Sequence, residues 1–141
     1  QQATPTTEPT TEPEEGENPY DSATAVSPTS DLNTALNNDL KTVLESVFDG
    51  VKLTDSSTDE SWEELKYLVD RTITEADARQ IADLLKENGY KVTSSDAESD
   101  KYHYHFSKTI LGEEYDDISI IIYLTEEEYA NPQEISITLY K

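Results

Sequence analysis

The chain has 141 residues, with 31 acidic residues against 10 Lys and Arg, which gives a net charge of -21. Phosphate recognition needs clustered Lys and Arg, so this balance excludes a nucleic-acid partner and fits a cationic one. The chain has no cysteine for a disulfide or a thiolate metal site, and no run of about 18 apolar residues to span a membrane.

Residues 1–30 differ in composition from the rest of the chain. The run TPTTEPTTEPEEGENP repeats Thr, Glu and Pro, and five of the six prolines lie between Pro5 and Pro28. Because proline favours extended backbone and glutamates repel one another, we predict a disordered, extended stalk over 1–30. A single globular domain is expected over 31–141, a length that can bury a core without disulfides.

The globular part opens with a predicted amphipathic helix. Ser30 or Asp31 can cap its start, and apolar residues then recur at spacings of three and four as far as Phe48. This stripe predicts a core-facing helix of roughly 18 residues that ends at Gly50.

A second helix is predicted over the segment TEADARQIADLLKENG. Thr74 and Asp77 can cap its start, and Asn88-Gly89 provides a stop signal. Its apolar side consists of Ala78, Ile81, Ala82, Leu84 and Leu85.

The segment between these helices is ambiguous. A polar loop, TDSSTDES, is predicted first, and the capping-box pair Ser61 and Glu64 then favours a short helix over 62–70. A strand is the alternative, because alternate positions in the same segment are apolar: Leu65, Tyr67 and Val69.

From Tyr90 onward, apolar and polar residues alternate with a period of two. Four strands are predicted, joined by the short polar connections SDAESD, LGEEYDD and EEEYANPQ. Short connections imply antiparallel neighbours, since parallel strands need long crossovers. The predicted fold class is therefore α+β: a two-layer sandwich whose N-terminal amphipathic helices pack on one face of a four-stranded antiparallel meander sheet.

Both histidines of the chain lie in the stretch DKYHYHFS. Its alternation directs three aromatic side chains to the core and places His103 and His105 on the outer face, with Cα atoms roughly 7 Å apart. Two imidazoles at that spacing can share a metal ion, so a weak zinc site is one hypothesis, and two polar side chains on a solvated face are the alternative. A third ligand would come from Asp96, Glu98, Asp100 or Glu134.

Two further hypotheses concern titration and calcium. The acidic surroundings are expected to raise the pKa of both histidines and suggest a pH switch. The segments 55–59 and 96–100 place oxygens on alternate residues, as calcium loops do, but both lack the glycine and the final glutamate of an EF-hand. We expect solvated loops there, with weak calcium binding as the alternative, and no other cofactor.

The outer face is also the candidate binding face. Ile121, Tyr123 and Tyr140 are expected there beside His103 and His105. Tyrosine suits an interface because its ring contributes contact area while its hydroxyl still forms hydrogen bonds. Ordinary cross-strand pairing is the alternative interpretation.

The chain shows no phosphate loop, nucleophile elbow or metalloprotease motif, so we expect no enzyme. Its stalk and small domain resemble the mature part of exported prokaryotic surface lipoproteins, with anchoring only through a removed N-terminal signal or lipid. We predict a monomeric, non-enzymatic binding or accessory module that is extracellular or anchored at the cell surface and binds a protein or another envelope component. A structural subunit of an envelope assembly or filament is the alternative, and a weak divalent-metal protein using His103 and His105 is the second.

Overall fold

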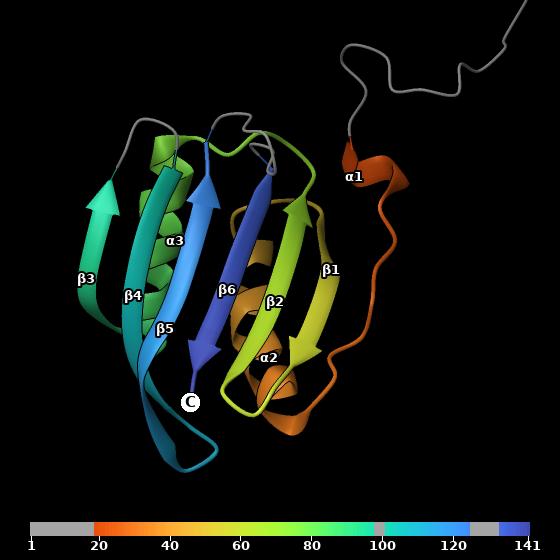
Figure 1. Cartoon of the computed structure of the whole chain (residues 1–141). Helices are drawn as coiled ribbons and strands as arrows, with labels where there is room; N and C mark the ends of the chain where they lie inside the picture. The colour runs from red at the N-terminus through yellow and green to blue at the C-terminus, as the bar shows by residue number, and fades with distance from the viewer. Residues whose placement is uncertain (1–18, 98–100, 125–132) are drawn as a thin grey trace, which may run out of the picture.

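The computed structural model describes residues 19–97, 101–124 and 133–141. In chain order, the elements are α1 (Pro19–Ser22), α2 (Asp31–Glu45), β1 (Val51–Thr58), β2 (Trp62–Val69), α3 (Glu75–Glu87), β3 (Lys91–Ala97), β4 (Lys101–Ile110), β5 (Glu113–Tyr123) and β6 (Glu134–Tyr140). They form an α+β fold in which helices pack on an open, six-stranded antiparallel sheet of order β1-β2-β6-β5-β4-β3 (Figure 1). No helix in these ranges is long and apolar enough to cross a membrane.

The sheet has six strands, so the prediction of a four-stranded sheet is wrong in number. The four predicted strands are present as β3 to β6 and form an antiparallel meander. β1 and β2 add a hairpin that pairs with β6 through β2. The sheet therefore continues past β6, where the sequence predicted an end.

The short helix predicted over 62–70 is wrong, and the alternative strand forms there as β2. Leu65, Tyr67 and Val69 all point into the core and are fully buried. Hydrogen bonding to β1 on one side and to β6 on the other outweighs the local capping signal, because β2 becomes an interior strand. Most of the predicted polar loop before it is the edge strand β1.

Helix α2 begins as predicted but ends earlier. Ser30 caps it by accepting a hydrogen bond from the Asn33 backbone N–H. The predicted end at Gly50 is wrong, because the last regular helical residue is Glu45 and the chain then turns. Glycine at position 50 reflects a close approach, since a Cβ there would lie 2.6 Å from the Tyr20 hydroxyl oxygen.

Helix α3 has the predicted ends. Thr74 and Asp77 form a complete capping box, with the Asp77 N–H bonded to Thr74 Oγ1 and the Asp77 carboxylate accepting from the Thr74 N–H. Asn88 caps the other end, and Gly89 follows with a positive φ of 94°. The helix carries the chain from β2 to the far edge strand β3 (Figure 1).

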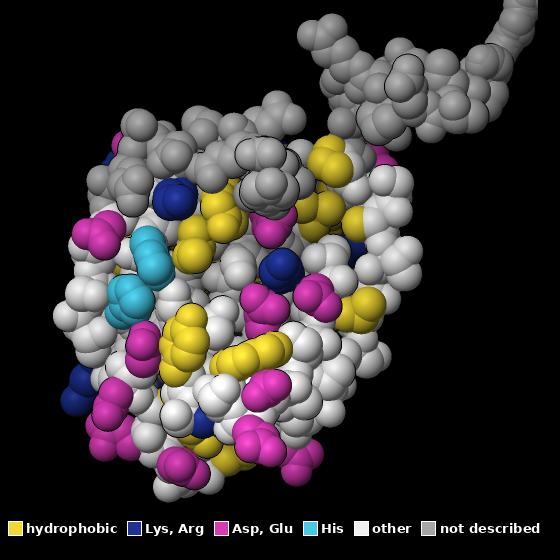
Figure 2. Space-filling model, in the orientation of Figure 1, with side chains coloured by type: hydrophobic (Ala, Val, Ile, Leu, Met, Phe, Trp, Pro, Cys, Tyr) yellow, Lys and Arg dark blue, Asp and Glu magenta, His cyan; other side chains and the backbone are white. Residues whose placement is uncertain are grey.

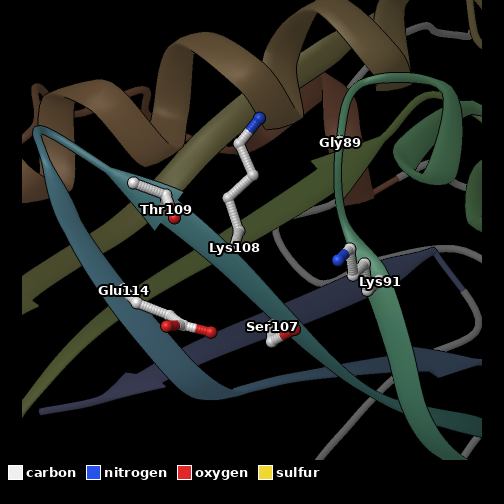
Figure 3. Close-up of a pocket in the computed structure, with 6 residues that line it drawn as sticks. All are labelled: Gly89, Lys91, Ser107, Lys108, Thr109 and Glu114. Atoms are coloured by element: carbon white, nitrogen blue, oxygen red, sulfur yellow. The ribbon is translucent and has the colours of Figure 1, made fainter.

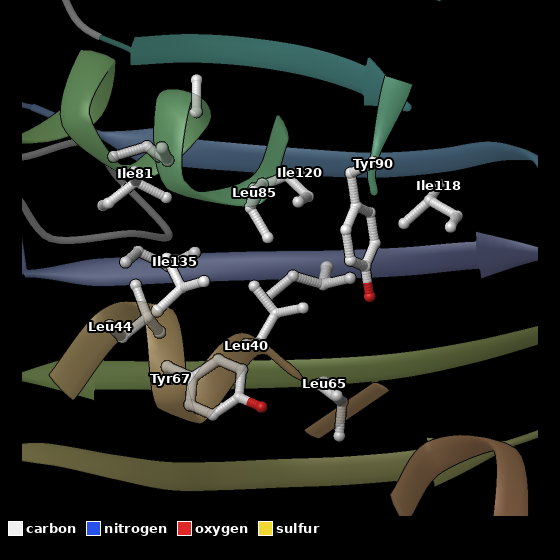
Figure 4. Close-up of a cluster of buried hydrophobic side chains, with 14 of the residues drawn as sticks. Leu40, Leu44, Leu65, Tyr67, Ile81, Leu85, Tyr90, Ile118, Ile120 and Ile135 are labelled. Carbon is white, nitrogen blue, oxygen red and sulfur yellow. The ribbon is translucent and has the colours of Figure 1, made fainter. Parts of the chain in front are cut away.

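The hydrophobic core lies between the sheet and the two long helices (Figure 4). Two buried tyrosines have their hydroxyls satisfied by α2, because Tyr67 donates to Asn37 Oδ1 at 2.6 Å and Tyr90 donates to Asp39 Oδ2 at 2.9 Å. Leucines and isoleucines of both layers fill the remaining space between them: Leu40, Leu44, Ile81, Leu85, Ile118, Ile120 and Ile135. On β4, Tyr102 and Phe106 are buried and Tyr104 is half-buried.

One carboxylate is buried on this inner side of the sheet. Glu63 is 1% exposed, and its Oε1 accepts hydrogen bonds of 2.8 Å from Ser30 Oγ and Asn33 Nδ2. Its Oε2 accepts from Thr58 and lies 2.8 Å from Lys141 Nζ. Burial raises the pKa of the carboxyl, but these four partners outweigh burial and hold the pKa below its ordinary value.

Residues 19–30, which the sequence assigns to the stalk, lie beside the edge strand β1. The Val26 N–H donates to the Leu53 carbonyl at 2.8 Å, and Lys52 Nζ donates to the Tyr20 carbonyl at 2.7 Å. Residues 1–18 lie outside the described residues, so a disordered stalk stays a prediction.

We predict that Glu63→Gln lowers the free energy of unfolding by about 3 kcal/mol at pH 7, because it removes the negative charge of a buried carboxylate to which four side chains donate. The measurement is urea unfolding followed by Trp62 fluorescence. Glu60→Gln, at an exposed position in the β1–β2 turn, is the matched control and should change stability by less than about 0.5 kcal/mol.

The same comparison has a predicted pH dependence. A carboxyl whose pKa is lowered by folding contributes stability above about pH 4.5 and loses it as the pH falls through the lower, folded-state pKa. The difference between wild type and Glu63→Gln should therefore shrink in acid. Equal effects of Glu63→Gln and Glu60→Gln at neutral pH would contradict the structural role of Glu63.

Candidate functional site

The sheet has two faces, and α2 and α3 cover only one of them (Figure 1). We call the opposite side the open face, and Figure 2 looks onto it. In the described part of the chain, no helix or strand lies over it. Strand alternation and register place these side chains on it: Trp62, Glu64, Lys66 and Leu68 of β2, Asp96 of β3, Lys101, His103 and His105 of β4, Asp117, Ser119, Ile121 and Tyr123 of β5, and Glu134, Ser136, Thr138 and Tyr140 of β6.

The two histidines are neighbours on the open face. Their ring centroids are 4.4 Å apart and the ring planes are inclined by 35°. Each ring also contacts β5: His103 Nε2 lies 2.6 Å from Ser119 Oγ, and His105 Nδ1 lies 3.0 Å from Asp117 Oδ1. These two cross-strand hydrogen bonds fix the positions of both rings.

The expected rise in histidine pKa is wrong for His103. Burial lowers the pKa of its imidazole below the ordinary value, and the neighbouring His105 lowers it further. Asp96 and Asp117 act in the opposite direction, but their effect is smaller. The lowered pKa favours the neutral form of His103, so this histidine does not supply the upward shift on which the pH-switch hypothesis was based.

Ser119 and His103 lie at the distance of a nucleophile and its base, but their surroundings do not fit acyl transfer. Asp117 bonds to His105, so it does not orient His103. Ser119 is only 7% exposed, and it lies in a strand that pairs on both sides. The backbone N–H groups next to Ser119 are therefore hydrogen-bonded to the neighbouring strands and cannot form an oxyanion hole.

The metal hypotheses depend on residues that the structure describes only in part. Asp96 is the cross-strand partner of His103, whereas Glu98 and Asp100 lie outside the described residues. Among the described residues, no group of three His, Asp or Glu side chains could hold a metal ion. The segment 55–59 is not the expected loop, because β1 runs through Thr58.

The predicted binding residues divide into two groups on the open face. Ile121 is the cross-strand partner of His103, and Tyr123 lies two residues further along β5. Tyr140 lies toward the other end of the face, where its cross-strand partners are Trp62 and Asp117. Figure 2 shows hydrophobic side chains beside the histidines and acidic side chains gathered toward the β4–β5 turn.

Trp62 was not among the predicted site residues. It lines a hollow of about 250 Å³ together with Glu64, Thr138 and Tyr140. The sequence signal was available, because Trp62 alternates with the buried residues of β2. The predicted helix over 62–70 hides this signal, because alternate residues of a helix do not share a face.

A second hollow lies on the other side of Tyr140. Its volume is about 280 Å³, and Tyr115 and Lys141 line it together with Tyr140. The remaining lining residues are all acidic: Glu113, Glu114, Asp116 and Asp117. Tyr140 is shared by both hollows and is 48% exposed.

A third hollow, of about 230 Å³, lies beside the turn between α3 and β3 (Figure 3). Lys91 and Lys108 line it, which suggests an anion site, but Glu114 lines it too. The Lys108 ammonium already donates to the Asn88 carbonyl and lies 4.9 Å from the centroid of the Tyr90 ring. This lysine therefore stabilises the turn, and the hollow is the weakest of the three candidates.

Comparison with known proteins gives no match: no family model, curated protein or solved structure is significantly similar to the chain. The fold is that of an α+β protein whose six-stranded sheet has one helix-covered face and one open face.

We predict that His103 titrates below the ordinary histidine value of about 6.5. The measurement is an NMR titration of the imidazole resonances. Replacing His105 by Asn removes a neighbour that disfavours protonation, so the His103 midpoint should rise in that variant. A midpoint at or above 6.5 in the wild type would show that the ring is more solvated than the structure places it.

Proposed function

We propose that the chain is a non-enzymatic binding module and that the open face of its sheet is the binding surface. The observation that carries the proposal is the presence of aromatic side chains on a face that the core does not use. Tyr140 is 48% exposed, and Trp62 and Tyr123 are half-exposed, while the buried core lies on the helix-covered side.

Aromatic side chains in such positions favour binding for an energetic reason. An exposed aromatic ring contributes little to folding, but it contributes a large apolar area when a partner covers it. Tyr and Trp are also the residues that most often dominate the energy of protein interfaces. Cross-strand pairing accounts for Trp62 beside Tyr140, but it does not require Tyr123 on the same face, which a binding role does explain.

Display at the cell envelope is part of the same proposal. The Thr, Pro and Glu repeats of residues 1–18 suit a spacer that holds a domain away from a surface. A spacer of this composition would leave the open face of the sheet accessible to a partner. We therefore propose an extracellular or surface-anchored location, with the partner in the envelope or outside the cell.

The test combines a peptide panel and an oligosaccharide panel with variants of the open face and of the edge strand β3. Wild-type protein is screened against short peptides and soluble oligosaccharides, and each hit is checked by NMR. We expect Tyr123→Ser with Tyr140→Ser to weaken binding of the hits by about tenfold or more while the fold is preserved, because interface tyrosines each contribute about 1–2 kcal/mol.

The matched control is Val92→Ser, which removes an exposed apolar side chain from the edge strand β3. This variant should bind like the wild type. The proposal is contradicted if the panels yield no ligand, or if the ligands bind equally well to wild type and to the double tyrosine variant.

A further inference from the structure

The two hollows beside Tyr140 combine aromatic rings with uncompensated negative charge. Five carboxylates and a single lysine line them. That lysine, Lys141, is already paired with Glu63 at 2.8 Å and also donates to the Asp59 carbonyl. Within the described residues, no Lys or Arg forms an ion pair with Glu64, Glu113, Glu114, Asp116 or Asp117.

The aromatic rings are placed to receive a flat group. Trp62 and Tyr140 are cross-strand partners, so their side chains leave the sheet next to each other. The rings flank the first hollow, and Glu64 and Thr138 contribute oxygen atoms to its lining. Tyr140 and Tyr115 border the second hollow in the same way, with four carboxylates around them.

We propose that this surface, which we call the aromatic–acidic patch, binds arginine side chains of a cationic polypeptide partner. Guanidinium groups stack on the faces of Trp and Tyr rings and bond carboxylates through several N–H donors, so both features of each hollow are used. The inference rests on the proposed function and adds the chemical class of its partner.

The charge of the whole chain supports the same partner. With a net charge of -21, the protein attracts cationic polypeptides over distances longer than a hydrogen bond and repels acidic ones. This long-range attraction favours cationic partners but does not determine where on the surface they bind. The patch offers a specific place to bind, because its rings are at least partly exposed and none of its five carboxylates forms an ion pair with a Lys or Arg of the described residues.

A neutral sugar is the competing occupant, since sugar rings also stack on Trp and Tyr. Sugar hydroxyls can donate hydrogen bonds to the carboxylates around the second hollow, but a neutral sugar leaves their charge unbalanced, whereas a guanidinium group also balances it. The observed excess of carboxylates therefore favours the cation.

The first experiment uses a peptide with three arginines separated by glycines, capped at both ends, and its analogue with citrulline in place of arginine. Citrulline has nearly the same shape but no charge. At 0.15 M salt, we expect the arginine peptide to shift the NMR signals of Trp62, Thr138 and Tyr140 and to bind at least tenfold more tightly than the citrulline peptide.

The second experiment separates stacking from charge. Trp62→Leu with Tyr140→Leu keeps the net charge and the strand-forming character of both positions, and NMR spectra confirm the fold. We expect about tenfold weaker binding of the arginine peptide, because the ring faces are lost.

The third experiment separates the patch from the general acidity of the chain. Glu64→Gln with Asp116→Asn removes two charges from the patch, and Glu45→Gln with Glu87→Gln removes two exposed charges from the helices. The patch variant should lose several-fold more affinity than the helix variant. Equal losses in the two variants would mean diffuse electrostatic attraction and would overturn the inference.

Two other results would overturn the inference while leaving the proposed function in place. One is equal binding of the arginine and citrulline peptides at the patch. The other is binding of chitohexaose to the Trp62 hollow when the arginine peptide causes no shift there. Failure of the proposed function gives a different result, in which no ligand of either panel depends on the tyrosines of the open face, and the inference then fails with it.

Discussion

The buried carboxylate of Glu63 is the constraint on which the arrangement of both faces depends. Successive side chains of a strand point to opposite faces, so an inward Glu63 places Trp62 and Glu64 on the open face. The carboxylate can be buried only because Ser30, Asn33, Thr58 and Lys141 all donate to it. A slip of β2 by one residue would remove every one of these partners and bury Trp62 instead.

This buried network connects parts of the molecule that are distant in sequence. The N-cap of α2, the end of β1 and the residue after β6 all reach the same carboxylate, so α2 and β6 are fixed relative to β2. The register of β2 against β6 then sets Trp62 beside Tyr140 and Glu64 beside Thr138. The aromatic–acidic patch therefore follows from an interaction on the opposite side of the sheet.

The sequence predicted the parts of the fold that local patterns determine. The capping box at Thr74 defines α3, and strict alternation defines the four C-terminal strands and puts His103 and His105 on the outer face. Local pattern does not identify β2 as a strand, because the spacing of its apolar residues fits both the helical period of 3.6 and the strand period of 2. Pairing with β6 selects the strand. The lowered pKa of His103 was equally out of reach, since it depends on burial by neighbouring strands.

The most direct test of the central claim is quenching of Trp62 fluorescence by ions of opposite charge, since Trp62 is the only tryptophan of the chain. If Glu63 points inward, the half-exposed indole lies near carboxylates on the open face. Caesium should then quench its emission more strongly than iodide at equal ionic strength, and added salt should reduce the difference. An indole that neither ion quenches, or that iodide quenches more strongly, would contradict the register of β2 and the patch built on it.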